Sequence, residues 1–274
     1  MSSALSLVVT GRPEFARPQY FRLPGSPDRE YYAFIPANCA PGAEPLVLVH
    51  GISRNAAELV LRFAPHAQRL GVPLIAPLFP RQAYGMYQQV IDQRHGSRAD
   101  EALFAILADA SARWDVGHDR FALFGFSGGG QFAHRFAILY AQHVRACIPV
   151  SAGWYSWPDV TLRWPYGLRK APLGPIDWAA MAQVPFHIVV GRRDTRDDEA
   201  LRRNAKLDAL QGTDRVQRAR NWHHAMQKAG FNAEGSFTVL PRTRHNFNSA
   251  QRHGLVPLAF NLLGHEAGHD KDFK

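Results

Sequence analysis

The chain has 274 residues, of which 46% are hydrophobic and 20% charged, a composition typical of a globular protein with a substantial core. The formal net charge is +9, but the basic residues are spread along the chain, which disfavours nucleic-acid binding and leaves open a preference for anionic substrates. No apolar run approaches the roughly 20 residues of a membrane span. We therefore expect a single domain over residues 1–274 with no membrane span, either as a monomer or as a homodimer.

The amino-terminal stretch MSSALSLVVTGRPEF has neither the basic segment nor the small-residue cleavage site of a secretory signal. Cys39 lies in a Pro/Gly loop, and Cys147 lies in the apolar run ACIPV. Two cysteines placed in this way are a weak case for a disulfide, which agrees with a reducing compartment. These features predict a cytoplasmic protein.

Short apolar runs alternate with longer helical patterns along most of the chain. Strands are predicted at 31–35, 45–50, 72–77, 120–126, 145–150, 185–191 and 235–240, and helices at 99–114, 129–143, 216–229 and 250–263. From residue 45 onward the strands are continuously apolar, as in a sheet that helices cover on both faces. The pattern predicts an α/β fold with a mostly parallel, doubly wound sheet of about eight strands.

One segment, residues 153–178, has no clear period and contains four of the six tryptophans. It follows the carboxyl end of a predicted strand, where open α/β sheets bind their ligands. We expect a short cap or lid insertion at about 153–182, although aromatic residues that merely cover the sheet edge are an alternative. Arg163 or Arg169 could meet an anionic group. The side chains expected to line a substrate pocket are Trp154, Tyr155, Trp157, Trp164 and Tyr166.

A nucleophile motif lies where a predicted strand meets a predicted helix. Residues 125–129 read GFSGG, which satisfies the pattern G-x-S-x-G with Ser127 at its centre. At so sharp a turn, side chains two residues from the serine would collide with their surroundings, which explains the glycines. The phosphate-binding alternative is disfavoured because G-x-G-x-x-G and G-K-[ST] are both absent from this turn. The motif therefore predicts a serine nucleophile.

A serine hydroxyl needs a base, and the base needs a group that fixes its tautomer. Asp194 follows the predicted strand 185–191, and His245 follows the last predicted strand, so the three residues occur in the order Ser, Asp, His. Asp197 and Asp198 are the alternative acids. The other histidines considered as bases, which fit packing or surface positions better, are His134, His223, His224 and His253.

Acyl transfer also needs N–H groups that stabilise an oxyanion. His50 and Gly51 end a predicted buried strand, so the following backbone amides can turn into the site. We expect the donors to be Gly128, which follows the nucleophile, and Ile52, with Ser53 as the alternative to Ile52. His50 itself is expected to support the loop.

The segments LVHGISRNAAE, GFSGGGQFAHRFA, GRRD and RHNF together resemble α/β-hydrolase-fold serine esterases, in particular the bacterial polyhydroxybutyrate depolymerase and feruloyl-esterase-like group. The resemblance implies Ser127 as nucleophile, Asp194 as orienting acid and His245 as base. The chain departs from the HGGG subtype of lipases and esterases because no further glycines follow Gly51 directly.

The expected reaction is hydrolysis of a carboxylic ester, with a small aryl or a short or hydroxylated acyl group, through an acyl-enzyme that needs no cofactor. A peptidase or another acyl hydrolase is the alternative within this fold, because a triad does not fix the leaving group. The alternative of another class is a catalytically silent protein that binds a ligand or a partner.

Residues 265–269 read HEAGH, a formal match to the zinc motif H-E-x-x-H. Gly268 weakens a helix there, and the chain provides no downstream third ligand. The pattern therefore predicts a solvated tail and no metal site.

Overall fold

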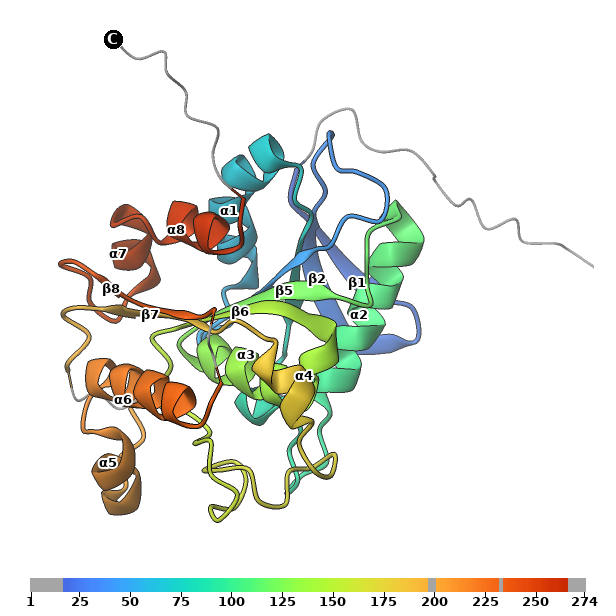
Figure 1. Ribbon diagram of the computed structural model, residues 1–274. Coiled ribbons are helices and arrows are strands. Elements are labelled where there is room, and N and C mark those ends of the chain that lie inside the picture. The colour runs from blue at the N-terminus through green and yellow to red at the C-terminus, as the bar shows by residue number, and fades with distance from the viewer. Residues whose placement is uncertain (1–16, 197–200, 232–233, 266–274) are drawn as a thin grey trace, which may run out of the picture.

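The computed structural model describes residues 17–196, 201–231 and 234–265 (Figure 1). Eight strands form one sheet in the order β1-β2-β4-β3-β5-β6-β7-β8, in which β1, β2 and β4 pair antiparallel and all the other pairs are parallel. The predicted fold class is confirmed. The strands are β1 (Gln19–Leu23), β2 (Ser26–Phe34), β3 (Leu46–Val49), β4 (Leu74–Leu78), β5 (Phe121–Phe126), β6 (Val144–Val150), β7 (His187–Gly191) and β8 (Ser236–Leu240).

Helices cover both faces of the sheet, and each face has its own hydrophobic core (Figure 1). One face carries α1 (Ala56–Leu70), α7 (Phe247–Arg252) and α8 (Leu255–Leu262). The opposite face carries α2 (Ala99–Trp114), α3 (Gly128–Leu139), α4 (Trp178–Ala182) and α6 (Arg215–Lys228), and α5 (Ala205–Gln211) packs against α6. Short 3₁₀ turns lie at Tyr87–Gln89 (η1) and Ala141–His143 (η2).

Several elements differ from the sequence-based expectations. The helix predicted at 250–263 is two helices, because Gly254 adopts a left-handed φ of 87° between α7 and α8. Helix α1 was not predicted, and it contains Pro65, a residue that usually interrupts helices. Strand β1 and helices α4 and α5 were not predicted either.

The residues between β6 and α4 form an irregular segment that folds back on itself. The backbone N–H of Trp157 donates to the carbonyl of Tyr166 at 2.8 Å, and the backbone N–H of Leu168 donates to the carbonyl of Asp159 at 2.9 Å. In Figure 1 this yellow-green segment extends beyond α3 and α4 at the lower side of the molecule. Its role as a cap or lid stays a prediction. Within the described ranges, no helix is long and apolar enough to cross a membrane.

Candidate active site

The turn between β5 and α3 holds Ser127 in a strained conformation. Its φ and ψ are 55° and −112°, a region that non-glycine residues adopt at an energetic cost, often at functional sites. The neighbouring glycines make the turn possible, because a Cβ atom on Gly125 would lie 2.1 Å from the carbonyl oxygen of Gly129. A Cβ atom on Gly129 would lie 2.1 Å from the carbonyl oxygen of Val49. The structure thus presents Ser127 between a buried strand and the amino-terminal end of α3.

The structure brings Ser127, His245 and Asp194 together, although they are far apart in the sequence. The Ser127 Oγ atom lies 2.9 Å from Nε2 of His245, and Nδ1 of His245 lies 2.9 Å from Oδ2 of Asp194. The Asp194 side chain is fully buried, whereas that of His245 is 18% exposed. This linear arrangement allows the imidazole to take a proton from the serine while the carboxylate holds the ring.

Asp194 and His245 are held by two turns that pack on each other. The turn after β7 contacts the loop after β8, where Arg193 donates its backbone N–H to the carbonyl of Thr243 at 2.8 Å. His245 stacks on Phe126, with ring centroids 5.5 Å apart. The next residue, Asn246, caps α7 by accepting a hydrogen bond from the backbone N–H of Ser249 at 3.0 Å. The imidazole of His245 is therefore restrained by the ring of Phe126 on one side and by the start of α7 on the other.

A buried arginine that the sequence analysis did not identify contacts the acid. The Nη1 atom of Arg215, at the start of α6, lies 3.4 Å from Oδ1 of Asp194. The side chain of Arg215 is 1% exposed. Arg215 therefore contacts the carboxylate oxygen that His245 leaves available. Nothing in the local sequence RVQRAR singles out this arginine, because the contact depends on how α6 packs against β7.

The expected oxyanion donors lie beside the nucleophile. Ile52 and Ser53 line the same pocket as Ser127, and the Cγ2 atom of Ile52 lies 3.0 Å from the position that a Cβ atom on Gly128 would occupy. Gly128 is the first residue of α3, where backbone N–H groups have no partner within the helix. Both predicted amides are therefore near Ser127, and their donor role stays a prediction.

His50 is a buried structural residue at the base of this loop. Its Nε2 atom accepts a hydrogen bond from the backbone N–H of Phe79 at 3.0 Å, and its Nδ1 atom lies 2.8 Å from the carbonyl of Gly51. Burial lowers the pKa of His50 to about 4, so the ring is neutral near neutral pH. The hydroxyl of Tyr87 donates to the carbonyl of His50 at 2.8 Å and also packs next to Gly128. Tyr87 supports the site from η1 and was not anticipated from the sequence.

Comparisons with known proteins identify the fold of the chain. No protein-family model and no curated protein matches the chain. A poly(aspartic acid) hydrolase-1 from Sphingomonas sp. KT-1 matches with a TM-score of 0.74 and 22% identity over 89% of this chain and 98% of that one. A poly(3-hydroxybutyrate) depolymerase from Bordetella parapertussis matches with a TM-score of 0.72 and 24% identity over 90% and 89%. A ferulic acid esterase matches with a TM-score of 0.61 and 15% identity over 90% of this chain and 98% of that one. The chain has the α/β-hydrolase fold.

In this α/β-hydrolase fold, Ser127 and His245 open into a pocket of about 280 Å³. The pocket is bordered by the loop after β3, the start of α1 and the start of α7. Its lining includes Asn55, Glu58, Leu59, Asn246, Phe247 and Asn248. Polar groups are therefore abundant around the nucleophile.

None of the five aromatic residues expected to line the substrate pocket lines this one. Tyr155 is fully buried and stacks on Trp222 with ring centroids 4.6 Å apart. Trp154 and Trp164 are 5% and 4% exposed, and Trp157 borders a separate surface pocket. Packing of the insertion against α3 and α6 buries part of this aromatic surface. The contribution of these residues to substrate binding stays a prediction.

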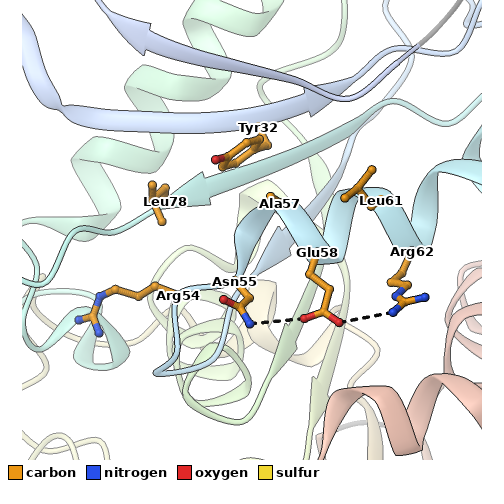
Figure 2. Close-up of a pocket in the computed structure, with 8 residues that line it drawn as sticks. All are labelled: Tyr32, Arg54, Asn55, Ala57, Glu58, Leu61, Arg62 and Leu78. Carbon is orange, nitrogen blue, oxygen red and sulfur yellow. Dashed lines mark hydrogen bonds and ion pairs between the residues drawn. The ribbon is translucent and has the colours of Figure 1, made fainter.

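A larger pocket of about 610 Å³ adjoins the one at Ser127, and the two share Asn55 and Glu58 (Figure 2). Figure 2 shows Glu58 between Asn55 and Arg62 along α1, with distances of 3.4 Å and 3.8 Å to these residues. Tyr32 and Leu78, from β2 and β4, border the pocket on the sheet side. Because the two pockets share these residues, we interpret the larger pocket as an extension of the site, although neither Ser127 nor His245 lines it.

Two predictions concern residues outside the described ranges. One is the pair of alternative acids, Asp197 and Asp198, and the other is the part of the HEAGH motif that follows His265. Among the residues that the structure does describe, no group of three or more His, Cys, Asp or Glu side chains is arranged to hold a metal ion.

Proposed function

We propose that this chain is a serine hydrolase that cleaves carboxylic esters through an acyl-enzyme intermediate. The observation that carries the proposal is the contact of 2.9 Å between Ser127 Oγ and His245 Nε2, with Asp194 at the other ring nitrogen. This contact occurs at a strained turn that borders a pocket. A nucleophile, a base and an orienting acid in this relation are the requirements for acyl transfer.

In the proposed reaction, Ser127 attacks the acyl carbon while His245 takes the hydroxyl proton. The negative charge that develops on the carbonyl oxygen is stabilised by the backbone N–H groups of Gly128 and Ile52. His245 then protonates the leaving alcohol, and the acyl group remains on Ser127. A water molecule, deprotonated by His245, hydrolyses the acyl-enzyme and restores the serine. Asp194 holds the imidazole throughout, and the cycle needs no cofactor.

The proposed substrate is a small aryl ester or an ester of a short or hydroxylated acyl group. A pocket of about 280 Å³ at Ser127 fits a small ester, and the adjoining pocket offers further room. The names of the similar structures support ester cleavage, since they include a poly(3-hydroxybutyrate) depolymerase and a ferulic acid esterase. We also propose a cytoplasmic location, because the chain has only two cysteines, Cys39 and Cys147, and such sparse use of cysteine fits a reducing compartment.

The first experiment treats the protein with a fluorophosphonate and maps the adduct by intact mass and peptide mass spectrometry. We expect one adduct on Ser127 in the wild type and none on this peptide in Ser127→Ala. A panel of 4-nitrophenyl esters and matched anilides then separates esterase from peptidase activity. We expect the Ser127→Ala variant to lose at least about three orders of magnitude in kcat/KM for esters.

The chain offers a matched control for this labelling. The Oγ atom of Ser111 lies 3.1 Å from Nδ1 of His118, and Nε2 of His118 lies 3.5 Å from Oδ1 of Asp119. These three residues therefore form a second chain of contacts from a serine through a histidine to an acid. The side chains of His118 and Asp119 are 48% and 90% exposed, and Ser111 occupies a regular helix instead of a strained turn. We expect Ser111→Ala to be labelled and active like the wild type. Folded wild-type protein that takes up no label at Ser127 would refute the proposed nucleophile.

A further inference from the structure

A fully buried arginine on α3 has only neutral hydrogen-bond partners. The Nη1 atom of Arg135 donates to the carbonyl of Gln88 at 2.7 Å and to Oε1 of Gln131 at 3.3 Å, and Nε donates to Oγ of Ser156 at 3.2 Å. Its Nη2 atom has no hydrogen-bond partner among the described residues. A buried guanidinium is normally paired with a carboxylate, because an uncompensated charge in the interior is costly. The charge of Arg135 is therefore left without a counter-ion within the part of the chain that the structure describes.

A second arginine approaches the same aromatic ring. The Cζ atom of Arg135 lies 4.1 Å from the ring centroid of Trp154, and the Cζ atom of Arg202 lies 5.6 Å from it. Arg202 also lies 5.4 Å from the ring of Tyr166, and its side chain is exposed. No ion pair joins either arginine to an acidic side chain in the described ranges. Two guanidinium groups therefore lie near the ring of Trp154, and that of Arg202 also lies near the ring of Tyr166.

The two charges disfavour each other, and both remain present near neutral pH. Burial, followed by the charge of Arg202, lowers the pKa of Arg135 to about 9, which still leaves the guanidinium protonated. Stacking on Trp154 and Tyr166 offsets part of the cost. A bound anion beside Arg202 would reduce the repulsion, and an exposed guanidinium group matches the geometry of carboxylates and other oxyanions.

Two residues connect Arg135 with the catalytic turn. Gln131, which contacts Arg135, donates its backbone N–H to the carbonyl of Ser127 at 3.1 Å. Gln88, another contact of Arg135, lies with its Cγ atom 3.4 Å from the position of a Cβ atom on Gly128. Along α3, Arg135 is eight residues after Ser127, which corresponds to about 12 Å of helix rise, and helical side chains lean toward the amino-terminal end. We take a length of this order as what a substrate needs in order to extend from Ser127 toward the arginine pair.

We propose that Arg202 and Arg135 bind a carboxylate at the far end of the ester substrate, against the rings of Trp154 and Tyr166. The anion enters on the exposed side, where Arg202 contacts it, and the buried charge of Arg135 strengthens the positive field behind Trp154. This inference rests on the proposed function and narrows its substrates to esters with a remote anionic group. The same chemistry could bind free phosphate, and the experiment below distinguishes the two sources.

The test compares two matched series of 4-nitrophenyl esters of increasing acyl length. One series carries a neutral methyl end and the other carries a carboxylate in its place. At the length that spans Ser127 and Arg202, we expect wild-type kcat/KM to be about 10-fold higher for the carboxylate ester, mainly through a lower KM. This preference should shrink as the salt concentration rises, because Arg202 is exposed.

Three variants assign the preference to the arginines. Arg202→Gln should lower the ratio of carboxylate to neutral kcat/KM by about 5-fold or more, and Arg135→Met, which removes the buried charge, should lower it as well. Arg220→Gln removes an exposed arginine on α6 and should leave both rates and their ratio unchanged. Arg202→Gln changes a surface residue, so the test does not depend on whether the Arg135 variant folds.

The outcomes separate this inference from the proposed function. Hydrolysis of the neutral esters, lost in Ser127→Ala, tests the proposed function alone. Equal kcat/KM for the two series at every length, or the same ratio in Arg202→Gln and Arg220→Gln, would overturn the carboxylate site. Inorganic phosphate that inhibits neutral-ester hydrolysis through Arg202, without any preference between the two series, would also overturn it in favour of a site for free anions.

Discussion

Arg215 and His245 bind different oxygen atoms of the same carboxylate. Arg215 approaches Oδ1 of Asp194 at 3.4 Å, while His245 lies 2.9 Å from Oδ2. The side chains of Arg215 and Asp194 are both almost completely buried, so solvent screens their interaction only weakly. A positive charge in this position attracts the carboxylate and holds it in place beside His245. Arg215 is therefore a positioning residue that acts on catalysis through Asp194.

Arg215→Met should lower kcat for esters by about 10-fold or more while changing KM little. The reason is that Asp194 loses the buried partner of its Oδ1 atom and holds the imidazole of His245 less firmly. Arg215→Lys keeps the charge and should restore most of the original kcat. Steady-state kinetics with 4-nitrophenyl esters measure kcat and KM for both variants. A kcat in Arg215→Met equal to that of the wild type would contradict a positioning role.

The glycines around Ser127 predict a difference in stability. Gly129→Ala should lower the free energy of unfolding by more than about 3 kcal/mol, because the new Cβ atom would lie 2.1 Å from the backbone oxygen of Val49, which cannot move independently of β3. Gly85→Ala is the control, since its Cβ atom would lie 3.4 Å from its nearest neighbour, the carbonyl oxygen of Arg81. Its effect should stay within about 1 kcal/mol. Urea unfolding of both variants checks this, and equal losses would contradict the steric argument.

Local sequence patterns predicted the parts of the site that depend on strand ends. Ser127, Asp194 and His245 each follow an apolar strand, and the carboxyl ends of parallel strands meet at one edge of a sheet. Their proximity could therefore be expected from the sequence alone. Seven of the eight strands could be predicted for the same reason, since apolar β-rich runs are local signals.

Other features depend on packing between distant segments. Arg215 and Arg135 carry no motif, and their contacts with Asp194 and Trp154 follow from the way α6 and α3 pack against the sheet. The aromatic insertion was expected to line a pocket, but hydrophobic burial places Tyr155 against Trp222 in the core. The break at Gly254 needed a left-handed backbone that a helical pattern does not reveal. Tertiary packing decided each of these cases.

Asn246 connects helix capping with catalysis. Asn246→Ala should lower the free energy of unfolding by about 1 kcal/mol, because the backbone N–H of Ser249 loses its partner, and should also lower kcat several-fold because the preceding residue is His245. Asn204→Ala removes the equivalent cap of α5, which does not line the pocket at Ser127, and should show a similar loss of stability with unchanged kcat. Chemical denaturation and ester kinetics give the comparison. Equal kcat values in the two variants would show that the α7 cap does not restrain His245.

The buried imidazole of His50 predicts how stability depends on pH. Burial lowers its pKa from 6.5 to about 4, so between these values the unfolded chain binds a proton that the folded protein does not. Stability should therefore fall as the pH drops through this window, by up to about 3 kcal/mol from His50 alone. His134, whose pKa burial also lowers, adds a loss of the same sign.

His50→Asn should flatten this dependence, because the asparagine side chain does not titrate. At neutral pH the variant should be less stable by about 1–3 kcal/mol, since an amide cannot reproduce both ring contacts, with the backbone N–H of Phe79 and the carbonyl of Gly51. The slope of unfolding free energy against pH, measured by urea titration between about pH 4 and pH 6.5, should be smaller than in the wild type. His224→Asn, at an exposed position on α6, should keep the wild-type slope. If both variants kept that slope, the unfolded and folded chains would bind the same number of protons at His50, and a neutral buried ring at the base of the Gly51 loop would be ruled out.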